Sequence, residues 1–234
     1  MSYKQHMVVS CLLYLLTVPT SIVPKQPKTE LSLPNKECYW VLPDRLLAGQ
    51  YPGSYNEIST RKKLCRYLDT GISFFLDLTE QNEISPTGER KPYDKILQAE
   101  AHARNIKVQH QRMSIQDFGI PTRAFMTRIL DTIDDALKAG HKVYVHCWGG
   151  IGRTGTVVGC YFVRHGKSGE QALKHIARLW RSVGKSKTYP LSPEIEVQRK
   201  FVAEFTDTLK SESNFCFLEQ ERISNFQSPQ ENKE

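Results

Sequence analysis

The sequence of 234 residues lacks the cysteine patterns that hold many small domains together. Its six cysteines are widely scattered, with no Cys-x-x-Cys pair and no cysteine and histidine spacing of a zinc site. Neither a disulfide framework nor a structural zinc is therefore expected. An Asn-x-Ser/Thr acceptor is also absent, so nothing indicates a glycosylated extracellular protein. We expect reduced thiols.

A long apolar run is missing as well. A membrane-spanning helix needs about 20 apolar residues, whereas residues 7–18 form a shorter uncharged run that is followed by Pro19. This run resembles the core of a signal peptide, although no Ala-x-Ala cleavage site follows it. Cleavage, membrane tethering or export through residues 7–23, and local packing of the leader 1–24 all stay open. A cytoplasmic location is favoured.

Acidic residues are scarce in one part of the chain. The formal net charge is +7, and between residues 160 and 190 Glu170 is the one acidic residue among seven lysines and arginines. The positive field of residues 164–187 would attract anionic partners such as phosphorylated proteins, inositol phosphates or acidic lipids. A solvated helix face explains the same charges equally well. No specific nucleic-acid partner is predicted.

The composition that remains, 39% hydrophobic and 24% charged, is typical of one globular domain with appendages. We expect a linker over 25–36, a folded domain over 37–210 and a polar tail over 211–234. Hydrophobic periodicity predicts strands over 39–42, 46–50, 72–78, 106–111 and 142–146, and helices over 58–68, 93–104, 121–139 and 153–165. This alternation predicts an α/β fold with a central, mostly parallel sheet flanked by helices on both faces.

Two further helices are predicted from their first residues. Ser168 has Gln171 three positions later, which is the pattern of a capping box. Ser192 precedes Pro193, and proline is favoured at the first position of a helix. Residues 79–91 are polar and are predicted to form a loop.

The segment between the last predicted strand and its following helix carries the chemistry. Cys147 and Arg153 enclose five residues, three of them glycine: Trp148, Gly149, Gly150, Ile151 and Gly152. Glycines let successive N–H groups line one concavity, and the following helix points its positive end at the same place. The guanidinium of Arg153 matches two oxygens of a phosphate. The segment is therefore predicted to bind a phosphate group.

Cys147 is the candidate nucleophile of this segment. The N–H dipoles, the helix end and Arg153 all favour a thiolate over a thiol, and the thiolate is the reactive form. A buried cysteine in a glycine-rich turn is the structural alternative, but the coincidence with the glycines and Arg153 speaks against it.

His146-Cys-x5-Arg153-Thr154-Gly155 resembles the signature of the cysteine-dependent protein tyrosine and dual-specificity phosphatases. Asp117-x-x-x-Pro121 lies upstream and resembles the acid loop of the small dual-specificity type. The resemblance extends over about residues 37–210 and implies the fold of that superfamily. The order of the two motifs differs from that of the low-molecular-weight tyrosine phosphatases, in which the nucleophile comes first.

The resemblance implies a role for each matching residue. Cys147 would attack phosphorus, and Asp117 would act first as general acid and then as base, although an aspartate before a helix can also be a plain turn residue. Arg153 and the N–H groups of residues 148–153 would hold the phosphate, Thr154 would assist the leaving thiolate, and His146 would orient the loop. No metal or cofactor is required. Gln198 would either position water or satisfy buried backbone.

The substrate is less determined by the sequence. The loop between Cys147 and Arg153 contains no lysine or arginine, which favours a singly phosphorylated protein, with phosphotyrosine first and phosphoserine or phosphothreonine next. An inositol phosphate or phosphoinositide, a catalytically silent phosphoprotein-binding module and a rhodanese-like sulfurtransferase are the alternatives. Residues 53–55 or 80–93 are candidates for the pocket walls.

Overall fold

The computed structural model describes residues 32–81, 83–85, 88–89 and 92–207, which all belong to one compact unit. The predicted leader 1–24 and tail 211–234 lie outside the described residues. Within the described ranges, no helix is both long and apolar enough to span a bilayer.

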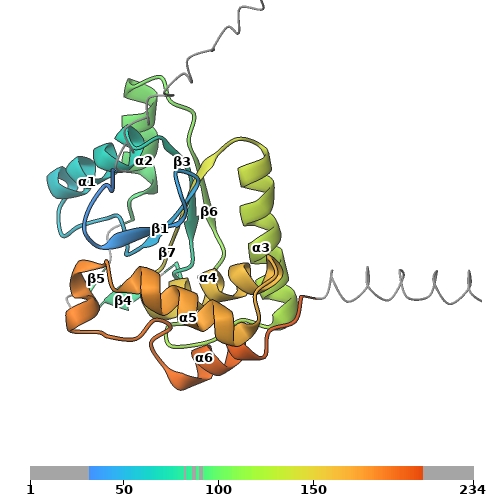
Figure 1. The fold of residues 1–234 in the computed structure, drawn as a ribbon. Helices are drawn as coiled ribbons and strands as arrows, with labels where there is room; N and C mark the ends of the chain where they lie inside the picture. Colours follow the sequence, from blue (N-terminus) through green and yellow to red (C-terminus); the bar gives the residue numbers. More distant parts are fainter. Residues whose placement is uncertain (1–31, 82, 86–87, 90–91, 208–234) are drawn as a thin grey trace, which may run out of the picture. The chain divides into compact units, whose positions relative to one another are not determined.

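A five-stranded sheet forms the centre, in the order β1-β2-β7-β3-β6 (Figure 1). Its strands are β1 (Cys38–Leu42), β2 (Leu46–Gly49), β3 (Ile72–Asp77), β6 (Gln109–Arg112) and β7 (Lys142–His146). All neighbouring pairs are parallel except β1 and β2, which pair antiparallel. The predicted mostly parallel sheet is confirmed.

Helices cover both faces of the sheet (Figure 1). The first group is α1 (Glu57–Asp69) and α2 (Asp94–Ala103), and the second is α3 (Arg123–Lys138), α4 (Gly152–Arg164), α5 (Gly169–Trp180) and α6 (Glu196–Ala203). Two separate hydrophobic clusters lie under these groups. The flanking helices predicted from the alternating pattern are therefore confirmed.

The sheet separates the two hydrophobic clusters, because side chains along each strand alternate between its two faces. In β3, Phe74 and Leu76 pack in the cluster under α3 and α4, whereas Phe75 packs in the cluster under α1 and α2. In β7, Val143 and Val145 belong to the first cluster and Tyr144 to the second. Successive side chains of a strand point to opposite faces, so strands covered on both faces are continuous apolar runs.

The observed helix starts agree only in part with those predicted from the sequence. The capping box of Ser168 and Gln171 is confirmed at the start of α5. The helix expected from Pro193 is wrong in position, because α6 begins at Glu196 with Ile195 as its N-cap. The Ser192 hydroxyl does not cap a helix but donates to the carbonyl of Ile151, at 2.8 Å.

Two other boundaries move by a few residues. Helix α3 begins at Arg123, with the hydroxyl of Thr122 accepting from the backbone N–H of Phe125, so Pro121 lies before the helix and not in it. The loop predicted over 79–91 contains a short hairpin of β4 (Ile84–Ser85) and β5 (Gly88–Glu89).

The parallel pairing sets where a site can form. Strands β3 and β7 end side by side, with Asp77 in register with His146. Ligands of open α/β sheets bind beyond the carboxyl ends of the strands. The residues that follow His146 lie at this edge, and a helix begins there.

Candidate active site

The segment from Cys147 to Ile151 connects β7 to α4. Gly150 has a φ of +73°, and a Cβ at this position would lie 2.4 Å from the backbone carbon of Gly49. Glycine is therefore required both by the conformation and by the close approach of β2. No side chain caps the start of α4, and the unbonded N–H groups of a helix start are a common binding place for anions.

The Cys147 sulfur lies at this concavity. Its side chain is 2% exposed, and its sulfur accepts a hydrogen bond from the N–H of Gly150 at 3.3 Å. A cavity of about 340 Å³ opens onto it. The cavity is lined by Asp117, Phe118, Cys147, Trp148, Gly149, Ile151, Gly152, Arg153, Lys185, Tyr189, Glu194 and Gln198.

Arg153 lies in the first turn of α4 and is 2% exposed. Its two terminal nitrogens pair with both oxygens of Glu83, at 2.6 and 2.8 Å, and one of them also donates to the carbonyl of Ile115 at 3.1 Å. Burial lowers the pKa of Arg153, but the hydrogen bond to Glu83 and the nearby negative charges outweigh it and raise the pKa well above its usual value. Arg153 is therefore a fixed cation beside Cys147.

Asp117 lies in the loop after β6 and reaches the same cavity. Its Oδ1 atom lies 2.8 Å from a terminal nitrogen of Arg153, and its side chain is 50% exposed. The next residue, Phe118, has a φ of +55°, an uncommon conformation for a residue with a side chain that often occurs at functional sites. The carboxylate and the Cys147 thiol thus face one cavity.

Two buried polar atoms at the site lack a hydrogen-bond partner among the described residues. They are Oγ1 of Thr154 and Oε1 of Gln198. The amide nitrogen of Gln198 donates to the carbonyl of Gly119 at 3.2 Å, so one end of this side chain satisfies backbone while the other faces the cavity. Both alternatives that the sequence left open for Gln198 are compatible with this geometry. A buried polar atom without a partner lowers the stability of a fold. Two such atoms at the site therefore fit a role in contacting a reacting group.

His146, the last residue of β7, directly precedes Cys147 and is fully buried. Its Nε2 lies 2.7 Å from the Tyr93 hydroxyl, and its Nδ1 lies 3.3 Å from the carbonyl of Cys147 and 3.9 Å from Oδ1 of Asp77. Burial acts to raise the pKa of Asp77, but the nearby rings of His146 and His110 and the hydrogen bonds that Thr79 donates outweigh it and hold the pKa well below its usual value. These buried polar contacts of His146 support the backbone at the nucleophile.

Sequence reasoning missed several residues of the site. Glu83 comes from the hairpin segment, Lys185 and Tyr189 come from the connection after α5, and Glu194 precedes α6. Burial raises the pKa of Glu194, and the negative charge of Asp117 adds to this effect. The sequence indicated Lys185 and Glu83 only as members of the basic stretch 164–187 and of the wall segment 80–93, and it did not single out Tyr189 or Glu194. Of the two segments considered as pocket walls, 53–55 is absent from the described lining, and the second contributes through Glu83 to Arg153.

The basic stretch divides into different environments. Arg164 is buried and pairs with Asp131, Asp134 and Asp207, so it belongs to the interior and does not attract partners. Lys174 pairs with Glu170 on the surface of α5. Lys185, in contrast, lines the cavity.

The fold and the family comparison together place the chain in the cysteine-based protein tyrosine phosphatase superfamily, and in its dual-specificity group. Residues 35–213 match the family model PTP-SAK, described as "Swiss Army Knife protein, DSP-PTPase phosphatase domain". The chain belongs to this family. The resemblance inferred from His146 to Gly155 is confirmed.

Individual relatives are distant. The putative tyrosine phosphatase 067L of Invertebrate iridescent virus 3 is 25% identical over 74% of this chain and 66% of its own length. The dual specificity protein phosphatase CDC14C of Homo sapiens is 26% identical over 56% of this chain and 27% of its own length. The chain thus spans less than two thirds of either relative.

A solved structure shares the fold. PTPMT1 in complex with PI(5)P superposes with a TM-score of 0.54 at 20% identity, over 76% of this chain and 99% of that chain. The members of the superfamily that resemble this chain thus include proteins named as protein phosphatases and one solved with a phosphoinositide.

Proposed function

We propose that the chain is a phosphomonoester hydrolase that acts through a cysteinyl-phosphate on Cys147 and removes phosphate from phosphotyrosine in proteins, with phosphoserine and phosphothreonine as further substrates. The observation that carries the proposal is the convergence of Cys147, Arg153 and Asp117 on one cavity, with the Asp117 carboxylate 2.8 Å from the Arg153 guanidinium. Family membership supports the reaction class.

In the first step, a sulfur lone pair of Cys147 forms a bond to phosphorus while the ester P–O bond breaks. Asp117 donates its proton to the departing oxygen. The charge that develops on the phosphoryl oxygens is stabilised by the N–H groups of residues 148–153 and by Arg153. The positioning of Arg153 by Glu83 before substrate binds reduces the reorganisation that this step requires.

In the second step, water attacks the phosphocysteine and the S–P bond breaks. Asp117, now ionised, accepts a proton from that water. The free Oγ1 of Thr154 is available to donate to the departing thiolate, and the free Oε1 of Gln198 is available to accept from the water. Inorganic phosphate then leaves, and Cys147 is ready for another cycle.

The proposal is tested by Cys147→Ser. Hydrolysis of 4-nitrophenyl phosphate and of a phosphotyrosine peptide should become undetectable while thermal unfolding and phosphate binding are retained. Continued turnover by the folded variant would exclude Cys147 as nucleophile. Cys160→Ser is the matched control, because Cys160 lies within α4 on its buried face and does not line the cavity.

Two other functions are separated by the same preparation. A silent phosphoprotein-binding module would bind the phosphotyrosine peptide but release no phosphate, and the presence of Cys147, Arg153, Asp117 and Thr154 speaks against it. A sulfurtransferase would turn over thiosulfate without hydrolysing a phosphate ester, and it would leave Asp117 without a task.

A further inference from the structure

Lys185 brings a cation to the phosphate loop from a distant part of the chain. It lies in the short helix η1 (Gly184–Lys187), and its Nζ donates to the carbonyl of Gly149 and to Oε1 of Gln50, both at 2.9 Å. The side chain is partly buried and lines the same cavity as Cys147 and Arg153. The loop between those two residues contains no cation of its own.

The backbone around Lys185 is anchored. The N–H of Gly184 donates to the carbonyl of Lys36 at 2.7 Å, and the N–H of Lys185 donates to a carboxylate oxygen of Glu37 at 3.3 Å. With the backbone held on one side and Nζ bonded on the other, the ammonium group has a defined position. It does not behave as a freely moving surface lysine.

The charge of Lys185 has no direct counter-ion. Its hydrogen-bond acceptors are an amide and a carbonyl, and it forms no ion pair in the described part of the chain. Arg153, in contrast, pairs with the carboxylates of Glu83 and Asp117. Buried charges are normally paired, so an unpaired cation that faces a substrate cavity indicates an anionic ligand.

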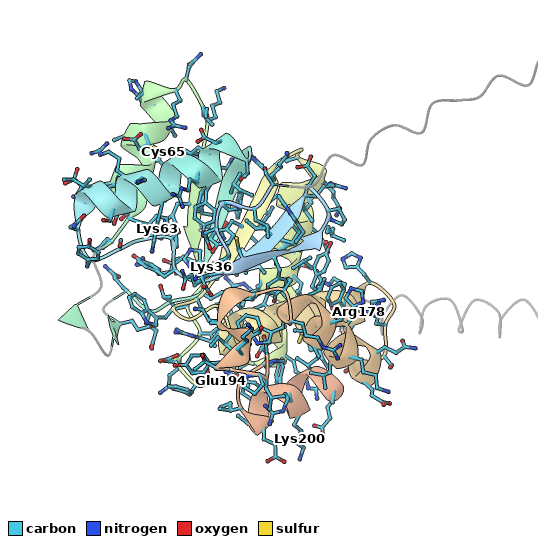
Figure 2. All side chains as sticks on the ribbon, turned by 60° about the vertical axis from the view of Figure 1, so that its left-hand side comes forward. Lys36, Lys63, Cys65, Arg178, Glu194 and Lys200 are labelled. Atoms are coloured by element: carbon cyan, nitrogen blue, oxygen red, sulfur yellow. The ribbon has the colours of Figure 1, made fainter. Side chains whose placement is uncertain are left out.

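The surroundings reinforce this imbalance. Burial lowers the pKa of Lys185, and the nearby negative charges, that of Glu37 first, offset the effect only in part. Lys63 in α1 is similar, because within the described residues its Nζ donates to the carbonyl of Gly53 at 3.0 Å and to no carboxylate, and burial lowers its pKa. Figure 2 shows Lys63, Lys36 and Glu194 in that order from top to bottom of the view. Glu194 also lines the cavity but forms no ion pair with Lys185 in the described part of the chain.

We propose that Lys185 forms a second anion subsite beside the phosphate loop, which binds a phosphate or carboxylate group that the substrate carries in addition to the phosphate attacked by Cys147. Phe118 and Tyr189 line the cavity as largely exposed aromatic walls and would contact the carbon skeleton between the two groups. This inference rests on the proposed function, and it places a cation from the basic stretch 164–187 beside a loop that contains none.

The test uses substrates that differ only in a second charge. Aryl phosphates with a carboxylate on the ring are compared with their carboxamide counterparts, at the meta and at the para position. We expect kcat/KM to favour the carboxylate by roughly tenfold at one position, which corresponds to one charge-assisted hydrogen bond. Lys185→Met should remove the preference and Lys185→Arg should retain it.

Lys187→Met is the matched control, because Lys187 lies in the same short helix, is exposed and does not line the cavity. Its carboxylate preference should equal that of the unmodified chain. A Lys185→Met variant that slows both substrates of a pair by the same factor would show that Lys185 only supports Gly149. That outcome, or the absence of any carboxylate preference in the unmodified chain, would overturn the proposal.

A binding experiment separates this subsite from the proposed chemistry. In the Cys147→Ser background, calorimetry should give tighter binding of the carboxylate substrate, and Lys185→Met should remove the difference. If the unmodified chain hydrolysed no phosphate ester but this difference in binding persisted, the proposed function would be wrong and the subsite would stand. Equal binding would overturn the subsite alone.

The ratio of kcat/KM between two paired substrates also identifies the molecule that carries the second anionic group. The pairs are inositol bisphosphate against monophosphate, and a phosphotyrosine peptide with glutamate against glutamine at the neighbouring position. Dependence on Lys185 in either pair supports the subsite and names its ligand.

Discussion

The carboxylate of Glu83 forms a two-point ion pair with the guanidinium of Arg153, although the two residues are 70 positions apart. The short hairpin segment thus contributes directly to the phosphate site. Because both side chains are almost fully buried, the pair is shielded from salt and holds Arg153 in one orientation.

Glu83→Gln should therefore reduce kcat/KM for an aryl phosphate by roughly 10- to 100-fold, since small displacements of a positioning group are costly. The amide keeps the size of the side chain but removes one charge. Steady-state kinetics measures the loss, and Glu57→Gln, which removes a surface carboxylate paired with Arg61, is the control. Unchanged kinetics in a folded Glu83→Gln variant would show that Arg153 holds its orientation without the pair.

Asp117→Asn should slow esters according to their leaving group. For a poor leaving group such as phenol, the loss of a general acid should cost roughly 10²- to 10⁴-fold in kcat/KM, whereas 4-nitrophenolate departs without a proton and should be affected much less. A series of substituted phenyl phosphates measures the dependence. Equal slowing across the series would remove Asp117 from the role of general acid.

Asp77 predicts a stability effect that depends on pH. Because its pKa in the folded protein lies below the unfolded value of about 3.9, the stability it contributes is complete above that value and is lost as the pH falls toward the folded pKa. Asp77→Asn should lower the free energy of unfolding at neutral pH by roughly 3 kcal/mol, because it leaves Arg112 without its buried counter-ion.

Denaturant titrations between about pH 3 and pH 7 test this expectation. The Asp77→Asn curve should be flatter at the acidic end, whereas Asp135→Asn, which changes an exposed residue paired with Lys138, should follow the unmodified protein. Parallel curves for Asp77→Asn and the unmodified chain would contradict the assignment of an ionised Asp77.

Gly150→Ala should destabilise the fold as well as the site. The positive φ costs about 1–2 kcal/mol for alanine, and the new methyl group would meet backbone atoms of Gly49 and Gln50 at 2.4 to 2.6 Å. Gly149→Ala is the matched comparison, since its Cβ would meet only side-chain carbons of Ile151 at 3.5 Å or more. The midpoint temperature of thermal unfolding should fall for Gly150→Ala and remain nearly unchanged for Gly149→Ala. An equal effect of both substitutions would show that the approach of β2 is not limiting.

Local patterns in the sequence were enough to predict most elements of the fold. Residues that are neighbours along the chain form the apolar runs of β3 and β7 and the helical pattern of α3. The period of the hydrophobic residues is enough to tell these strands from this helix. The sequence predicts the start of α6 at Pro193, before its true start at Glu196, because Ser192 and Pro193 carry a start signal. In the fold, however, the Ser192 hydroxyl donates to the carbonyl of Ile151. Propensity is outweighed where a tertiary contact uses the same group.

The sequence by itself determined the strand, loop and helix that carry Cys147 and Arg153, because residues six positions apart are placed by local geometry alone. Only the tertiary structure decided that Glu83 pairs with Arg153, that Asp77 lies beside His146, and that Lys185 reaches Gly149. Those contacts depend on the register of the sheet and on the packing of distant connections. No pattern of neighbouring residues encodes which side chains such packing brings together.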